Sequence, residues 1–221
     1  MAMRNSVALA TLLVSMFVAF PAICQPVKAI PAASLDLAAR LQEEESHPGQ
    51  REAAYKAGGK VAAFCANCHG EGGNSNNAAI PNLAGQNPTY LLEQLRQFSD
   101  GSRRNEFMER MIKALSPAEK IGIVVFYSSQ EVTHKPSANA ALVGQGLAYY
   151  NNVCARCHGA QGRGNAKVAR VAGQQPDYLN VTLKRYRDGS GVRNEPLMAA
   201  NTRLMTDADI AAVVAYVSSM K

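Results

Sequence analysis

Tryptophan is absent from this chain of 221 residues, and aromatic residues account for only 6% of it. At this length the chain forms one ordinary domain or two small ones. Two small domains with so few large side chains would have thin hydrophobic cores, and such cores need an added source of stability. A bulky bound group would supply it.

The chain also lacks an apolar run long enough to cross a membrane. After Arg4 the apolar stretch covers 7–20, shorter than the roughly 20 residues of a membrane span, and proline and small residues follow it. This pattern is typical of a cleaved secretory signal at 1–29, with cleavage after Cys24 or Ala29. We therefore expect export to the periplasm, with an uncleaved membrane anchor as the alternative.

No stretch of convincing length alternates apolar and polar residues, so we expect an all-α chain. The segments 116–119 and 206–209 resemble capping boxes that start helices. Apolar residues recur at helical spacing in four stripes: Ala54, Ala57, Val61 and Phe64; Leu91, Leu92, Leu95 and Phe98; Ile121, Val124 and Val125; and Ile210, Val213, Val214 and Val217.

Cysteine is scarce, but its placement is regular. Apart from Cys24, the cysteines form two Cys-x-x-Cys pairs, and a histidine follows each pair directly. The two motifs are Cys65, Cys68 and His69, and Cys154, Cys157 and His158.

The sequence around the two motifs is duplicated. The Ala-Gly-Gln at 84–86 recurs at 172–174, and the segments that follow also match, with slips of one residue. The residues before the repeat include Glu43, Glu44 and Glu45, which are typical of a solvated helix or tail. We predict an N-terminal extension at 30–50, a first domain at 51–132, a linker at 133–139 and a second domain at 140–221.

Three chemistries use a Cys-x-x-Cys pair. A zinc site needs two pairs close together in one domain, and a thioredoxin-type redox pair prefers a βαβ context; neither condition is met here. In covalent haem attachment, both thiols form thioethers and the adjacent histidine ligates the iron. Two large apolar haems would also supply the missing core. We therefore predict two covalently attached haem c groups, with thioethers at Cys65, Cys68, Cys154 and Cys157 and iron ligands at His69 and His158.

Methionine is the first candidate for the sixth iron ligand, because a thioether raises the reduction potential and suits electron transfer. Met108 and Met198 follow an Asn-Glu pair in each repeat and precede the last capping box. The alternatives are Met111 and Met205, which we expect in the core, and His47 and His134, which do not recur in the repeat.

At these motifs the chain resembles the dihaem cytochrome c4 family, over about residues 51–221. That family has two tandem class I cytochrome c domains related by a pseudo-twofold axis, each wrapped around one haem, with the haems close enough to exchange electrons. The resemblance implies that His69 with Met108, and His158 with Met198, are the axial pairs.

One residue departs from the family pattern. The family commonly has a proline ahead of the Ala-Gly-Gln segment, and the carbonyl of that proline orients the ligating histidine. Pro81 fits, but the second repeat has Ala169. The carbonyl survives this change, whereas the stiffness of proline does not. We therefore expect the two haems to have unequal potentials.

The resemblance implies electron transfer and no catalysis. We expect a periplasmic carrier that moves single electrons from a quinol-oxidising complex or a dehydrogenase to a terminal oxidase or reductase, with transient association with membrane respiratory complexes. The alternative is a dedicated dihaem subunit of a sulfide, thiosulfate or alcohol dehydrogenase. A haem enzyme such as a peroxidase needs an open iron position, and the paired methionines argue against it.

The net charge is +6, with most of the excess in the second repeat, and no nucleic-acid-binding motif is present. A basic face on the second domain would steer it towards an acidic redox protein, and a solvated face that includes propionate-binding arginines is the alternative. The basic residues in question are Arg163, Lys167, Arg170, Lys184, Arg185 and Arg187.

Overall fold

A computed structural model describes residues 32–134 and 139–221, which belong to one compact unit, Pro31–Lys221. The predicted signal segment at 1–29, its cleavage sites and most of the predicted linker lie outside the described residues. Within those two ranges every regular element is helical, which confirms the all-α prediction. None of the described helices is long and apolar enough to cross a membrane.

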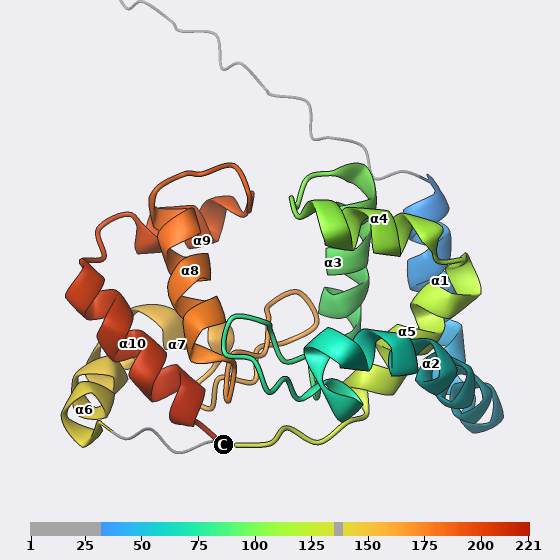
Figure 1. The fold of residues 1–221 in the computed structure, drawn as a ribbon, viewed down its shortest axis with the longest axis horizontal. Coiled ribbons are helices and arrows are strands. Elements are labelled where there is room, and N and C mark those ends of the chain that lie inside the picture. The colour runs from blue at the N-terminus through green and yellow to red at the C-terminus, as the bar shows by residue number, and fades with distance from the viewer. Residues whose placement is uncertain (1–31, 135–138) are drawn as a thin grey trace, which may run out of the picture. The chain divides into compact units, whose positions relative to one another are not determined.

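The helices follow a similar order in two halves of the chain (Figure 1). In each half a helical segment that ends in the Cys-x-x-Cys-His motif is followed by three further α-helices, and in the first half one more helix precedes that segment. The first half contains α1 (Ala32–Ser46), α2 (Pro48–His69), the short η1 turn (Glu71–Gly73), α3 (Pro88–Asp100), α4 (Glu106–Ala114) and α5 (Pro117–Ser128). The second half contains α6 (Ala140–Tyr149), the π-helical turn η2 (Tyr150–Cys154), α7 (Ala155–His158), α8 (Pro176–Arg187), α9 (Pro196–Thr202) and α10 (Asp207–Ser219).

The motif-bearing helix and the last helix cross closely in each half. Helix α2 packs against α5, and α6 packs against α10. A Cβ atom added to Gly58 would lie 1.9 Å from the carbonyl oxygen of Gly122, and one added to Gly146 would lie 2.0 Å from that of Ala212. The two backbones are therefore in direct contact at both crossings, and this contact fixes where each motif lies.

We expect Gly58→Ala to destabilise the protein, because the added methyl group meets backbone atoms that belong to another helix. Overpacking of this kind costs about 1–3 kcal/mol. Gly49, which is on the same helix and has nothing within 4 Å of an added Cβ, is the matched control. Gly49→Ala should not lower stability, since Gly49 lies in the first turn of the helix and alanine is the better helix former. Thermal unfolding of the haem-loaded variants measures both changes, and equal melting temperatures would refute the close crossing.

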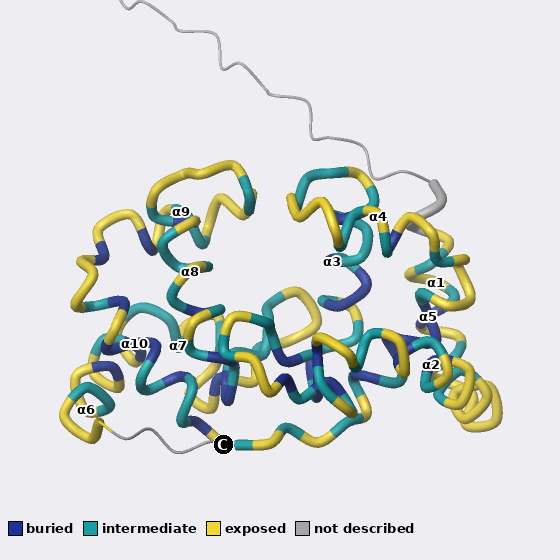
Figure 2. Tube along the Cα trace, viewed as in Figure 1, coloured by how far each residue is buried: buried dark blue, intermediate teal, exposed yellow. Residues whose placement is uncertain are grey.

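Most of the predicted stripes are buried where helices face one another, and both capping boxes form. Ser116 with Glu119, and Thr206 with Asp209, make reciprocal bonds at the starts of α5 and α10. Figure 2 shows the buried positions of α3, α5 and α10 in dark blue. They include these residues of the predicted stripes: Leu91, Leu92 and Phe98; Ile121, Val124 and Val125; and Ile210, Val213, Val214 and Val217.

The stripe predicted on α2 was partly wrong. Ala57 and Phe64 are exposed, and the buried residues next to α5 are Gly58 and Ala62. Only small side chains allow the two backbones to approach, so the buried face lies where the glycine is and not where the larger apolar residues recur.

The N-terminal extension is helical, but it is not simply solvated. Helix α1 contacts α2, α3 and α5. Leu41 is 3% exposed and belongs to the core of the first half, with Leu37 packed beside it, while Glu43 and Glu45 face solvent. The glutamates indicated only the solvated face of this helix. Its other face carries Leu37 and Leu41, which pack into the core of the first half.

Candidate functional site

Every residue predicted to bind haem lines one continuous cavity of about 1590 Å³, which extends through both halves. Apolar side chains from α4, α5 and α10 form much of its wall, among them Ile112, Val124 and Val213. The predicted residues on the wall are Cys65, Cys68, His69, Met108, Cys154, Cys157, His158 and Met198. Side chains from both sequence repeats therefore meet in a space large enough for bulky apolar groups.

The two motif histidines have equivalent surroundings. Each is the last residue of its helix, and its Nδ1 lies 2.9 Å from a backbone carbonyl oxygen, that of Pro81 for His69 and that of Ala169 for His158. A carbonyl only accepts hydrogen bonds, so Nδ1 carries the proton and Nε2 keeps its lone pair for a metal. The prediction that the carbonyl contact survives the change from proline to alanine is confirmed.

Burial lowers the pKa of both imidazoles, and the hydrogen bonds to the carbonyls oppose this effect only in part. Both histidines are therefore neutral at pH 7. The neutral imidazole is the form that ligates a metal ion.

None of the four motif cysteines forms a disulfide. Cys65 and Cys154 are half-buried, and Cys68 and Cys157 are exposed at the edge of the cavity. Burial raises the pKa of Cys154 to about 11 and also raises the pKa of Cys65. Across residues 32–134 and 139–221, no three His, Cys, Asp or Glu side chains gather closely enough to hold a metal ion. This arrangement does not support the zinc interpretation.

The two predicted methionine ligands lie on short helices whose first turns are capped. Asn105 Oδ1 accepts a hydrogen bond of 2.9 Å from the amide of Met108 at the start of α4. Glu195 caps α9 in the same way, through the amide of Leu197, one residue before Met198. Both methionines are half-buried and face the cavity.

The alternative ligands differ in their placement. Met205 is 5% exposed and belongs to the core of the second half, as expected, and Met111 is half-buried; both also line the cavity wall. His47 and His134 do not line the cavity; the Nδ1 atom of His134 bonds to the carbonyl of Met220.

Two arginines inside the cavity were not predicted from the sequence as functional residues. Arg103 and Arg193 both donate to the hydroxyl of Tyr178, and Arg103 also donates to Gln94 Oε1 at 2.8 Å and lies over the ring of Phe98. Burial, and after it the charge of Arg193, lowers the pKa of Arg103. Neither guanidinium pairs with a carboxylate anywhere in the described part of the chain.

Two partly buried cations without an anion fit a ligand that brings its own negative charges, and the propionates of haem are such groups. The apolar wall fits the haem ring, and the cysteine pairs fit its covalent attachment. The sequence signal for these arginines was weak. An arginine precedes the Asn-Glu pair in both repeats, but the alignment pairs Arg193 with Arg104, not with Arg103.

Comparison with known proteins identifies the family. The model of the cytochrome c family matches the chain twice, over residues 55–133 and 143–221. The chain belongs to the cytochrome c family. A cytochrome c4 from Thiocapsa roseopersicina is 32% identical over 174 residues, which cover 73% of this chain and 89% of that protein. A thiosulfate dehydrogenase electron acceptor from Thiomonas intermedia (strain K12) is 37% identical over 182 residues, covering 76% of this chain and 83% of that protein.

The fold agrees with these matches. The crystal structure of reduced recombinant cytochrome c4 from Pseudomonas stutzeri superimposes with a TM-score of 0.71 at 28% identity, covering 76% of this chain and 98% of that one. The predicted resemblance to the dihaem cytochrome c4 family is therefore confirmed, together with the two tandem cytochrome c domains and the two covalently attached haem c groups. This cytochrome is a dihaem electron carrier.

Proposed function

We propose that this cytochrome is exported to the periplasm and carries single electrons from a quinol-oxidising complex or a dehydrogenase to a terminal oxidase or reductase. The main observation in support is that two complete sets of cysteine, histidine and methionine side chains line one cavity. When bound there, each haem supplies a one-electron couple. Two such couples within one cavity allow the protein to accept an electron at one half and release it at the other.

We further propose that His69 with Met108, and His158 with Met198, close both axial positions of each iron. Support comes from the matching Nδ1–carbonyl bonds and from the place of both methionines on the cavity wall. An iron closed on both faces exchanges electrons without binding a substrate. These ligands therefore favour a carrier over a haem enzyme such as a peroxidase.

A second candidate function is that of dedicated electron acceptor for a thiosulfate dehydrogenase. The relative from Thiomonas intermedia supports it, since that protein is described as an electron acceptor of this kind. This function uses the same two haems and differs from the first only in the electron donor.

Only some of the six basic residues of the second half form an exposed, unpaired positive surface. Arg187 pairs with Asp188 and Asp207, and Lys184 also pairs with Asp207. The Nε atom of Arg170 is buried. Arg163, Lys167 and Arg185 remain exposed, and we propose that these three attract an acidic redox partner.

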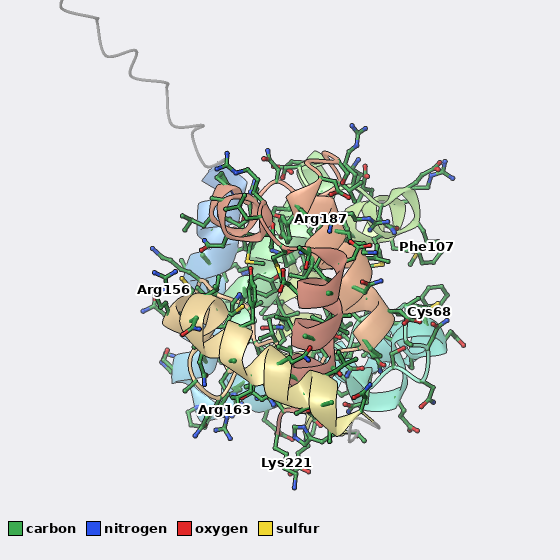
Figure 3. The ribbon with its side chains drawn as sticks, turned by 90° about the vertical axis from the view of Figure 1, so that its left-hand side faces the viewer. Cys68, Phe107, Arg156, Arg163, Arg187 and Lys221 are labelled. Atoms are coloured by element: carbon green, nitrogen blue, oxygen red, sulfur yellow. The ribbon has the colours of Figure 1, made fainter. Side chains whose placement is uncertain are left out.

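The edge of the cavity at Phe107 and Cys68 lies on a different side of the molecule from Arg163. Phe107, which is 59% exposed, and Cys68 lie on one side of the molecule in Figure 3, while Arg156 and Arg163 lie on the other. We propose that this edge is the point of electron exchange for the first haem.

A spectroelectrochemical titration of the haem-loaded protein tests this function. We expect two one-electron steps at different potentials, both with the spectrum of methionine-ligated ferric iron, because Pro81 stiffens one histidine-holding loop and Ala169 leaves the other more flexible. The reduced protein should then be reoxidised by membranes that contain a terminal oxidase, and the oxidised protein should be reduced by either donor. Two superimposable steps would contradict the unequal potentials, and an iron that binds added ligands freely would contradict the carrier function.

A further inference from the structure

The loops that hold the two histidines are clamped from the opposite half of the molecule. Gln174, in the second half, bonds to Asn82 of the first half twice: its Oε1 accepts from the Asn82 amide at 2.7 Å, and its Nε2 donates to the Asn82 carbonyl at 3.0 Å. Both bonds are made to the backbone of residue 82, so they would hold this loop with any side chain at that residue.

Gln86, in the first half, makes the reciprocal pair of bonds. Its Oε1 accepts from the amide of Arg170 at 2.7 Å, and its Nε2 donates to the carbonyl of Arg170 at 2.8 Å. Gln86 is 7% exposed. A buried amide group with both of its ends bonded to backbone in the other half is a fixed connection between the halves.

The clamped amides belong to the peptide units that hold the histidines. The carbonyl of Pro81 and the amide of Asn82 form one peptide unit, and so do the carbonyl of Ala169 and the amide of Arg170. A peptide unit is planar and rigid, so fixing its N–H also fixes the direction of its C=O. His69 Nδ1 donates to the first of these carbonyls and His158 Nδ1 to the second.

A continuous chain of hydrogen bonds results in each half. The histidine Nδ1–H donates to a carbonyl, and the N–H of the same peptide unit donates to a glutamine Oε1. Bonds that point in one direction along such a chain polarise and strengthen one another. A stronger bond from Nδ1 makes the imidazole a more basic ligand of the iron.

We propose that Gln86 and Gln174 are crossed positioning residues: the glutamine of each half sets the orientation and basicity of the histidine that ligates the haem of the other half. The inference rests on the proposed axial ligation by His69 and His158. It makes each haem sensitive to the opposite half through a path that avoids both haem rings. The reduction potential of each haem therefore depends on how closely the two halves pack against each other.

The clamp is not equally strong on the two sides. The Asn82 side chain holds its loop further, since its Oδ1 accepts from the amide of Ser75 and from Gln175 Nε2, and its Nδ2 donates to the carbonyl of Gly173. At the equivalent position, the Nε of Arg170 is buried without a hydrogen-bond partner among the described residues. The second loop therefore depends more on Gln86 than the first loop depends on Gln174.

The test replaces each glutamine by methionine, which has a similar length but makes no strong hydrogen bond. In haem-loaded Gln86→Met, the potential of haem 2, the haem attached to the second half, should rise while that of haem 1 stays unchanged. The rise follows because a less basic histidine stabilises ferric iron less well. Gln174→Met should raise the potential of haem 1 alone, and by a smaller amount. The two potentials are assigned beforehand with Met108→Ala and Met198→Ala, each of which alters one haem.

Gln130→Met is the matched control. Gln130 lies in the first half and also makes two hydrogen bonds, to Tyr55 and to the carbonyl of Phe126, but neither reaches the second half. This variant should leave both potentials unchanged. A second readout is amide hydrogen exchange, which should become faster at Arg170 in Gln86→Met and at Asn82 in Gln174→Met.

A shift of haem 1 in Gln86→Met, or shifts no larger than those of Gln130→Met, would overturn the inference. Its failure is distinguishable from that of the proposed function. If the wild-type protein shows two irons ligated by histidine and methionine and the glutamine variants leave them unchanged, only the crossed clamp is wrong. If the wild-type spectrum itself lacks these ligands, the proposed ligation is wrong as well.

Discussion

Replacing Met108 by alanine should lower the reduction potential of haem 1 and leave that of haem 2 close to its wild-type value. A thioether ligand stabilises the reduced iron, and alanine has no atom that could take its place. We expect a fall on the order of a few tenths of a volt, within the roughly 0.8 V that axial ligands control in haem proteins. The cavity wall at Met108 would also admit water or a small ligand to the iron.

Met111→Ala is the control for this experiment, since Met111 lies on the same helix and also lines the cavity. It should change neither the potential nor the spectrum of the ferric iron. The measurement is a redox titration of both variants, followed by addition of cyanide, which should bind to one iron in Met108→Ala only. If Met111→Ala gave the larger fall in potential, the proposed ligand would be wrong and Met111 would take its role.

Candidate haem-binding residues could be proposed from the sequence because their chemistry depends on local sequence. Two thiols and an imidazole within five positions need no distant partner to be recognised, and the duplication showed that the motif occurs once in each half. The last helices were equally clear, since Ser116 and Thr206 start them through bonds within one turn. The sequence therefore predicted the fold class, the number of haems and the candidates for iron ligation.

The features that the sequence did not reveal depend on contacts between distant segments. The buried face of α2 is set by the close approach of Gly58 to Gly122, which no stripe of apolar residues indicates. Arg103 is held inside the cavity partly by its hydrogen bond to the hydroxyl of Tyr178, which lies in the other half. Gln86 was visible only as part of a repeated Ala-Gly-Gln segment, and its partner, Arg170, lies 84 residues away in the chain.

Replacing Cys65 and Cys68 together by alanine should remove haem 1 and unfold much of the first half. An engineered core cavity of about 150 Å³ is already a costly defect. The cavity that we propose for the two haems measures about 1590 Å³. Its wall in the first half includes large apolar side chains that the protein itself leaves exposed, such as Phe64 and Phe107, and these would face water without the haem. Natively matured protein should then carry one covalent haem per chain, with a large loss of helical circular dichroism.

Asn67→Ala is the control, because Asn67 lies between the two cysteines, carries no thiol and should leave two haems attached. Intact-mass analysis gives the number of covalent haems, and circular dichroism reports the helices of the first half. A double variant that still carried two covalent haems would exclude Cys65 and Cys68 as the attachment site. A variant with one haem and full helicity would instead show that the packing of α1, α2 and α5 around Leu41 and Ile121 is sufficient to fold the first half without its haem.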